Sequence, residues 1–188
     1  MKKIIFAKHY LKMKNETPIY SWYAIRVKSR SEKKVYSDLA DQQITTYLPI
    51  HKVLRQWSDR KKWVEVPLIS GYVFVYISRK EYENVLRTPN VVCYIYFEGK
   101  AAIVRQEDID LLKRMLGQSD IAVEVTLDQL KPGQLVEIIA GPLVGMKGEL
   151  IEFQGKHKVA LRIQQIGCTV LIESPNQNLR PVISEFEK

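Results

Sequence analysis

The stretch from Val136 to Leu150, VEIIAGPLVGMKGEL, constrains the fold most, because a β-branched run breaks into a loop with three glycines and a proline and then resumes. Glycine reaches positive φ without steric cost, and proline fixes its own φ at about −65°. The pattern predicts two strands joined by a loop of fixed shape. Such a loop can serve a binding task or simply connect a hairpin, and turn chemistry alone leaves both interpretations open.

The length of 188 residues allows one large domain or two small ones. The apolar run Tyr72–Ile77 is far shorter than the roughly 20 residues of a membrane-spanning helix. At the amino terminus, the apolar stretch Ile4–Ala7 is also shorter than the roughly 7 to 15 residues of an export signal. We therefore expect a cytoplasmic protein without membrane association.

The two cysteines, Cys93 and Cys168, lie far apart and have no His or second Cys at the spacing of metal ligands. This arrangement supports neither a disulfide framework nor a zinc site. We expect both thiols to behave as small buried hydrophobic groups and predict that the chain binds no metal.

Catalytic chemistry has little support in the sequence. His9, His51 and His157 occur in unrelated contexts, and no Ser, His and Asp arrangement is evident. The loop Gly141–Gly148 lacks the Lys-Ser/Thr ending of a phosphate-binding P-loop. We predict that the protein is not an enzyme, has no catalytic residues and needs no cofactor.

Charge divides the chain into two unlike parts. Residues 1–116 hold 22 basic and 12 acidic side chains, whereas residues 117–188 hold 7 basic and 9 acidic ones. This asymmetry indicates two domains with different partners, the first facing a polyanion or an acidic protein surface. A basic excess is also compatible with a role in solubility alone.

Strands and helices alternate in the first part. The patterns predict strands at 22–27, 45–54, 64–68, 72–77 and 91–97, the strand at 72–77 being central, and helices at 31–43, 81–87 and 107–116. Ser31 is the expected N-cap of the first helix, and Gly117 is expected to close the last. This intermingling predicts a compact α/β sandwich with helices on a small sheet.

Short β-rich runs without a helical pattern follow in the second part, at 135–139, 148–153, 159–163 and 169–173. We expect a small closed barrel, because closure removes the open edges of so short a sheet. The predicted organisation is a tail at 1–19, a domain at 20–117, a linker at 118–127 and a barrel domain at 128–183.

The loop Gly-Pro-Leu-x-Gly-x-x-Gly at 141–148 resembles the KOW motif, and its place in a small carboxy-terminal barrel resembles the NusG family of transcription elongation factors. The first part agrees over four motifs: Trp22-Tyr23-Ala24, Glu32-Lys33-Lys34, Tyr47-Leu48-Pro49 and Pro67-Leu68-Ile69-Ser70-Gly71-Tyr72-Val73-Phe74-Val75. The resemblance covers residues 20 to 183. It implies an α+β protein in which a NusG-type amino-terminal domain, a small mostly antiparallel sheet with helices, is linked to an SH3-like KOW β-barrel.

Within the family, the segment VLRQWSDRKKWVEVPL at 53–68 resembles the specialised UpxY-type, RfaH-like paralogues. That resemblance implies a monomeric antiterminator that rides on RNA polymerase at capsular or exopolysaccharide operons. A general NusG-like elongation factor coupled to Rho or the ribosome, and a ribosome-associated RNA-binding KOW protein, remain as alternatives.

The family docks on the clamp helices of the largest polymerase subunit through an apolar depression. The matching positions here are Leu68, Ile69, Tyr72 and Phe74. Aromatics spaced i, i+2 on a strand share one face, so Tyr72 and Phe74 can enter one groove. The alternative is that this face only covers the core. Ser70 stands where the family commonly has proline, which predicts a looser loop.

A basic and aromatic segment supplies a second candidate surface. Phosphate-neutralising charge alternates there with flat rings on which an unpaired base can stack. We expect contact with the non-template DNA strand of the transcription bubble, whereas the alternative is a solvated hairpin whose tryptophans cover the sheet. The candidate residues are Arg55, Trp57, Arg60, Lys61, Lys62 and Trp63, together with Arg26, Lys28, Arg30, Lys33 and Lys34.

In the housekeeping factor, a turn of the barrel presents an aromatic and a basic residue to a ribosomal protein or to Rho. The matching partner-binding positions are Gln165, Ile166 and Cys168, with Ile166 in place of the aromatic and Cys168 in place of arginine. This mismatch argues against Rho and leaves a ribosomal protein as the candidate partner. Many β-branched residues and internal glycines predict that this part is β-structured, not helical. The KOW-loop residues Gly141, Pro142, Gly145 and Gly148 are assigned a structural role.

Overall fold

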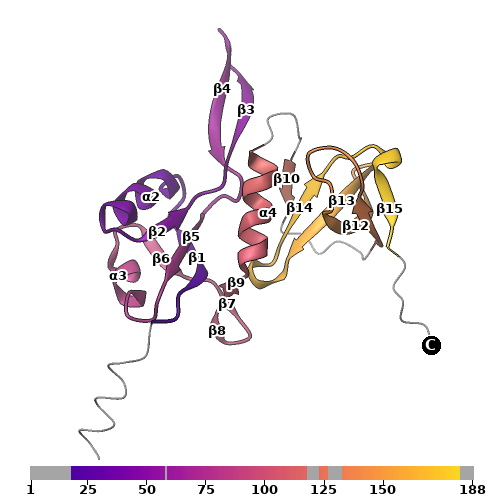
Figure 1. The fold of residues 1–188 in the computed structure, drawn as a ribbon. Helices are drawn as coiled ribbons and strands as arrows, with labels where there is room; N and C mark the ends of the chain where they lie inside the picture. The colour runs from indigo at the N-terminus through magenta and orange to yellow at the C-terminus, as the bar shows by residue number, and fades with distance from the viewer. Residues whose placement is uncertain (1–17, 58, 118–122, 127–132, 183–188) are drawn as a thin grey trace, which may run out of the picture.

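The computed structural model describes residues 18–57, 59–117, 123–126 and 133–182 (Figure 1). Of the tail predicted at 1–19, residues 1–17 lie outside this description. Of the linker predicted at 118–127, only residues 123–126 are described, and they form a strand. No helix among the described residues is long and apolar enough to cross a membrane.

The amino-terminal sheet has five antiparallel strands. Strands β2, β5, β1 and β6 lie in that order, and β9 also pairs with β1. The strand bounds are β1 Ser21–Val27, β2 Thr45–Tyr47, β5 Tyr72–Ile77, β6 Val91–Tyr94 and β9 Ile103–Val104. The apolar run at 72–77 is thus an interior strand, as its composition predicted.

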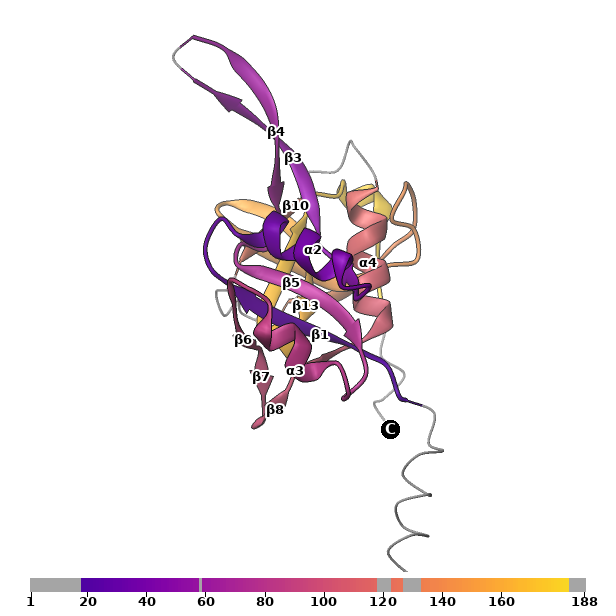
Figure 2. The same cartoon turned by 90° about the vertical axis from the view of Figure 1, so that its left-hand side faces the viewer.

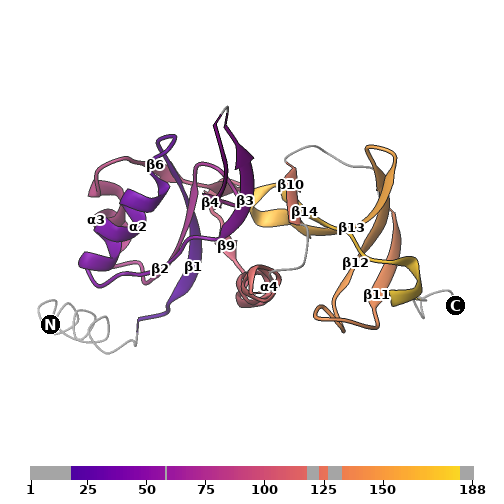
Figure 3. The ribbon, with the colours of Figure 1, turned by 90° about the horizontal axis from the view of Figure 1, so that it is seen from above.

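Alternation along the strands gives this sheet two buried faces. Ile25, Val73, Val75 and Ile77 pack with the apolar side chains of α2 (Glu32–Asp41) and α3 (Tyr82–Arg87). Trp22 and Ala24 of β1 and Tyr72 and Phe74 of β5 pack with α4 (Gln106–Leu116). Figure 3 shows α2 and α3 on one side of β1 and α4 on the other. Helices on both faces confirm the mixed helix-and-sheet prediction.

Two expected strands are interrupted, and the breaks create hairpins. The run predicted at 45–54 divides at Leu48-Pro49 into β2 and β3 (Ile50–Gln56), because proline lacks the N–H that would continue the ladder. Strand β3 pairs with β4 (Lys61–Pro67) in a ribbon that projects away from the sheets (Figure 2). The run predicted at 91–97 divides into β6 and β7 (Tyr96–Phe97), and β7 pairs with β8 (Lys100–Ala101).

The carboxy-terminal sheet has six antiparallel strands in the order β10-β14-β13-β12-β11-β15. Their bounds are β10 Val123–Thr126, β11 Gln134–Ile138, β12 Lys147–Phe153, β13 Lys156–Ile163, β14 Cys168–Ile172 and β15 Leu179–Pro181. The short 3-10 turns η1 (Gln164–Ile166) and η2 (Asn176–Asn178) interrupt the strands. The prediction that this part is β-structured is confirmed.

The predicted closure of this sheet into a barrel is not found in the described residues, where β10 and β15 form the two ends of an open strand order. Two short strands that the sequence patterns did not indicate lie at these ends. Strand β10 comes from the expected linker and covers β14, and β15 covers β11. The chain protects the inner strands by adding edge strands.

Candidate functional site

The four residues matched to the polymerase-binding surface lie together on one face of the amino-terminal sheet. Tyr72 and Phe74 belong to β5, and Leu68 and Ile69 belong to the turn before it. All four are buried, with Phe74 completely inaccessible. We call these four residues the occluded face. The i, i+2 spacing predicted the shared side of Tyr72 and Phe74 correctly, and their burial agrees with the alternative that this face covers the core.

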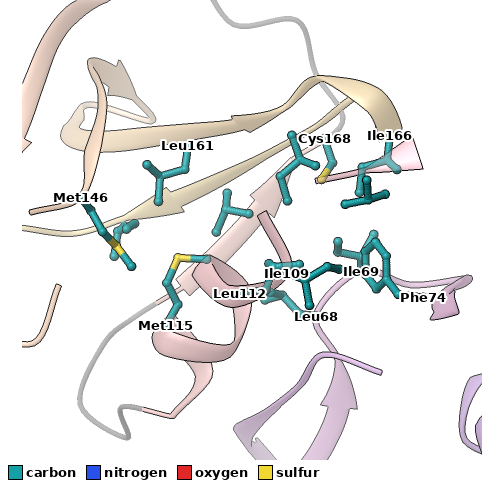
Figure 4. Close-up of a cluster of buried hydrophobic side chains, with 14 of the residues drawn as sticks. Leu68, Ile69, Phe74, Ile109, Leu112, Met115, Met146, Leu161, Ile166 and Cys168 are labelled. Atoms are coloured by element: carbon teal, nitrogen blue, oxygen red, sulfur yellow. The ribbon is translucent and has the colours of Figure 1, made fainter. Parts of the chain in front are cut away.

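Both α4 and the carboxy-terminal sheet cover the occluded face. One continuous apolar cluster joins it to Ile109 and Leu112 of α4 and to Ile166 and Cys168 of the carboxy-terminal sheet. Figure 4 shows Ile166 and Cys168 directed toward Ile69 and Phe74. The positions matched to two different partners therefore bury each other in this structure.

Helix α4 can fill the space between the two sheets because it is apolar on more than one side. Ile109, Leu112 and Met115 recur every three residues and are fully buried, and Leu111 and Leu116 are partly buried beside them. The Trp22 indole Nε1 donates a 2.8 Å hydrogen bond to Gln106 Oε1, which fastens the start of α4 to β1.

A buried carboxylate marks the contact between α4 and the carboxy-terminal sheet. Asp108 accepts two hydrogen bonds from Arg105, at 3.1 Å from Nε and 3.0 Å from Nη2. Burial raises the pKa of the Cys168 thiol to about 12, and the negative charge of Asp108 adds to the effect. At neutral pH Cys168 is therefore a protonated, apolar side chain, as predicted. The other thiol, Cys93, is only half-buried.

The far end of α4 contacts the KOW-like loop, a contact that the sequence reasoning missed. Arg114 Nη2 donates to the carbonyl oxygen of Val144 at 3.0 Å and approaches that of Pro142 at 3.5 Å. Leu143 and Met146 of the same loop are buried in the shared apolar cluster. The loop thus contributes contacts between the sheets in addition to shaping its own hairpin. The apolar residues on more than one side of α4 were the sequence feature that could have indicated this contact.

The three glycines of this loop have two different structural roles. Gly141 and Gly145 have φ of +86° and +82°, as the turn chemistry predicted. Gly148 instead lies in β12, where a Cβ atom would stand 2.7 Å from Val159 Cγ1 and 2.9 Å from the Ala160 carbonyl oxygen. Its role is close packing between strands, so the expectation that all three serve positive φ is wrong for Gly148.

The turn η1 lies in the contact between the sheets and carries a buried polar atom. It contacts β7 and β9 of the amino-terminal part, and Ile166 is buried there. The Gln165 Oε1 atom is buried without a hydrogen-bond partner among the described residues. Burying an unpaired polar atom costs about 1–3 kcal/mol, so this contact opposes tight closure.

The turn that carries the occluded face is fixed by hydrogen bonds. The Gly71 N–H donates to Glu32 Oε1 at 2.8 Å, and its carbonyl oxygen accepts from the Val27 N–H at 2.9 Å. Glu32 is buried at the start of α2. These bonds anchor the turn although Ser70 replaces the usual proline. Glu32 stands in the motif Glu32-Lys33-Lys34, but nothing in that motif indicates this role.

The candidate nucleic-acid residues of the ribbon are all exposed. Trp57 and Trp63 expose 45% and 63% of their surface, so the alternative that they cover the sheet is wrong. Leu54 lies opposite Trp63 and Arg55 lies opposite Lys62. Because neighbouring positions on a strand point to opposite faces, Trp57 and Trp63 lie on different faces of the ribbon.

The other candidate basic residues are distributed along the edge of the amino-terminal part. Lys28, Arg30 and Lys34 are exposed between β1 and α2 or within α2. Lys33 on α2 lies 3.7 Å from Glu65 on β4, near the base of the ribbon. Arg26 is paired across the strands with Tyr72, so it borders the occluded face and not the ribbon.

No cluster of three or more His, Cys, Asp or Glu side chains suited to a metal ion occurs among the residues that the structure describes. What the site offers chemically is binding surface: an apolar face with aromatic side chains, and a projecting arm with cationic and aromatic side chains. Apolar faces and basic surfaces of this kind bind proteins and nucleic acids, respectively.

Comparison with known proteins agrees with this arrangement. The family model described as transcription termination factor nusG matches residues 20–113, and the chain belongs to the NusG family. It is 26% identical over 167 residues to the transcription termination/antitermination protein NusG of Streptococcus pyogenes serotype M3, covering 81% of this chain and 90% of the relative. It is also 24% identical over 169 residues to the transcription elongation factor Spt5 of Acidianus ambivalens, covering 89% and 97%.

A solved structure described as domain interaction in Thermotoga maritima NusG has a similar fold. Its TM-score is 0.50 at 22% sequence identity, with 88% of this chain and 98% of that chain covered. The similarity at this level concerns the fold. The family match and the sequence relatives place the chain among the transcription termination, antitermination and elongation factors of the NusG/Spt5 type.

Proposed function

We propose that this protein is an elongation and antitermination factor that binds RNA polymerase through the occluded face and suppresses pausing or termination. The observation that carries the proposal is the gathering of Leu68, Ile69, Tyr72 and Phe74 into one apolar surface, covered by another part of the same chain. Buried aromatic anchors of this kind contribute most of the binding energy in protein interfaces.

The covering arrangement implies a gate. The occluded face cannot contact the clamp helices of the polymerase while the carboxy-terminal sheet packs on it. Polymerase binding therefore requires the carboxy-terminal sheet to separate, and the free energy of that separation reduces the apparent affinity. The same separation exposes Ile166 and Cys168 to a second partner, for which a ribosomal protein is the candidate.

The basic residues between β1 and α2 support contact with the non-template DNA strand beside the docked polymerase. Lys28, Arg30 and Lys34 are exposed there. The exposed basic ribbon at 50–67 supports a specialised factor of the UpxY type that acts at capsular or exopolysaccharide operons. Polymerase-associated occupancy restricted to a few such operons distinguishes this role from that of a general elongation factor, which would occupy most genes.

Transcription on a template with an intrinsic terminator, using the cognate polymerase, tests the proposal. We expect the protein to raise read-through and Ile69→Asp to abolish the effect, because a buried carboxylate disrupts an apolar interface. Val92→Asp is the matched control, since Val92 is 55% exposed on β6. Read-through unchanged by Ile69→Asp in a protein with a normal circular dichroism spectrum would reject the occluded face as the polymerase site.

A further inference from the structure

The ribbon of β3 and β4 is an independent arm. Its seven residue pairs, from Ile50 and Pro67 to Gln56 and Lys61, form a two-stranded sheet that pairs with no other strand among the described residues. At about 3.4 Å per residue the arm is roughly 20 Å long. Figures 1 and 2 show that it projects beyond both larger sheets.

Both faces of this arm carry positive charge. Arg55 and Lys62 form a cross-strand pair on one face, and the bond from the Trp57 N–H to the Arg60 carbonyl oxygen adds the next pair on that face. Lys61, opposite Gln56, lies on the other face. Trp63 lies two residues from Lys61 on β4, so it shares that second face. Leu54 is paired with Trp63, and Lys52 lies two residues from Leu54 on β3, so Lys52 shares this face too.

Two acidic side chains offset part of this charge. Asp59 forms an exposed 3.5 Å ion pair with Arg60, and Glu65, which lies directly opposite Lys52, also pairs with Lys33 of α2 near the base of the arm. Exposed ion pairs contribute little and are weakened by salt. The outer half of the arm therefore presents Arg55, Arg60 and Lys62 with Trp57 on one face, and Lys61 with Trp63 on the opposite face.

We infer that the arm enters the major groove of B-form duplex DNA tip first, with its two basic faces against the two phosphate backbones. This inference goes beyond the proposed contact of Lys28, Arg30 and Lys34 with the non-template strand, because it assigns duplex DNA to the separate ribbon of β3 and β4. A β-ribbon with its side chains is about 10 Å thick. The major groove is about 12 Å wide and about 8.5 Å deep and admits a two-stranded ribbon, whereas the minor groove is only about 6 Å wide.

Other nucleic acids fit this arm less well. A single strand runs along one surface, so it can contact the face of Arg55 and Trp57 or the face of Lys61 and Trp63, but not both. The major groove of A-form RNA is deep and too narrow for side chains to read. The basic residues of both faces can contact phosphates at the same time only when a phosphate backbone lies on each side of the arm.

Fluorescence anisotropy of labelled oligonucleotides tests the inference with the full chain. A 20-base-pair DNA duplex, one of its strands alone and an RNA duplex of the same sequence are titrated at several salt concentrations. Three double variants are compared: Arg55→Gln with Lys62→Gln for one face, Lys52→Gln with Lys61→Gln for the other, and Arg79→Gln with Lys80→Gln as the control. Arg79 and Lys80 are exposed just before α3. Figure 1 shows α3 well away from the arm of β3 and β4.

We expect the DNA duplex to bind more tightly than the single strand or the RNA duplex. Each face variant should lower the slope of log affinity against log salt by about 1.8, the loss of two phosphate contacts, and the control should leave it unchanged. Tighter binding of the single strand or the RNA duplex, or sensitivity to only one face, would overturn the inference. The read-through assay with Ile69→Asp tests polymerase binding separately. Loss of read-through in that variant would support the proposed polymerase function even if the arm does not prefer duplex DNA.

Discussion

Arg114 in the last turn of α4 donates a 3.0 Å hydrogen bond to the carbonyl oxygen of Val144 in the KOW-like loop. This bond ties the helix packed on the amino-terminal sheet to the most specified loop of the carboxy-terminal sheet. In the first turn of α4, Asp108 lies near Cys168, and burial, with a smaller contribution from the charge of Asp108, raises the pKa of that thiol to about 12. Both ends of α4 therefore lie against the carboxy-terminal part of the chain.

Alkylation of Cys168 should report opening. Its pKa is raised to about 12 by burial, and the thiolate is the reactive species. At pH 8 we expect iodoacetamide to react with the folded Cys93→Ser protein slower, by a factor on the order of a thousand, than with the same protein in urea. The folded rate should climb as the pH approaches 12. Equal rates in the folded and urea-unfolded protein would show that Cys168 is not sequestered.

Arg114→Ala should shift the chain toward the open form. Loss of its bond to Val144 should weaken closure by about 1 kcal/mol, which is roughly a fivefold change in the open population. In the Cys93→Ser background, the alkylation rate of Cys168 should rise by that factor. Arg79→Ala, on an exposed turn, is the control and should have no effect. A rate unchanged by Arg114→Ala would mean that the bond contributes nothing to closure.

Gln165→Met should have the opposite effect. The buried Gln165 Oε1 has no hydrogen-bond partner among the described residues, and an apolar side chain of similar shape removes that penalty. We expect closure to be stabilised by about 1 kcal/mol, seen as slower alkylation of Cys168 and a higher Tm. Gln164→Met, at an exposed neighbour, serves as the control. A lower Tm for Gln165→Met would indicate that the amide has a partner in solution.

The two kinds of loop glycine should respond differently to alanine. In Gly148→Ala the new Cβ would stand 2.7 Å from Val159 Cγ1, and such overpacking costs about 1–3 kcal/mol or more. Gly141→Ala meets open space but must adopt a φ of +86°, at a cost of about 1 kcal/mol. Urea unfolding should therefore show the larger loss for Gly148→Ala. The reverse order would contradict the packing role of Gly148.

The sequence predicted most helices and strands because local patterns determine them. The alternation in Trp22–Val27, the apolar run Tyr72–Ile77 and the periodicity of 107–116 each correspond to an observed element. Strand β10 at one edge of the carboxy-terminal sheet was missed, because it gains its stability from pairing with β14 and has only four residues of its own. Short strands of this kind depend on tertiary partners that a local pattern does not reveal.

The sequence predicted which residues form the candidate site, but it did not predict that the carboxy-terminal part of the chain covers them. Spacing placed Tyr72 and Phe74 on one face, and composition identified the exposed arm around Trp63. What covers Phe74 depends on contacts between residues some hundred positions apart, such as Ile166 in the same cluster. The sequence alone does not distinguish an apolar side chain that binds another protein from one that packs within its own chain.

The most direct test of the account is a measurement of the affinity for the cognate RNA polymerase in the closed and opened protein. Ile166→Asp should open the contact, because it places a carboxylate in the apolar cluster. We predict that this variant binds the polymerase at least about tenfold more tightly than the unmodified chain, and that adding Ile69→Asp abolishes binding. Equal affinity of the unmodified and Ile166→Asp proteins, or binding that survives the added Ile69→Asp, would contradict the claim that the carboxy-terminal sheet conceals the polymerase-binding face.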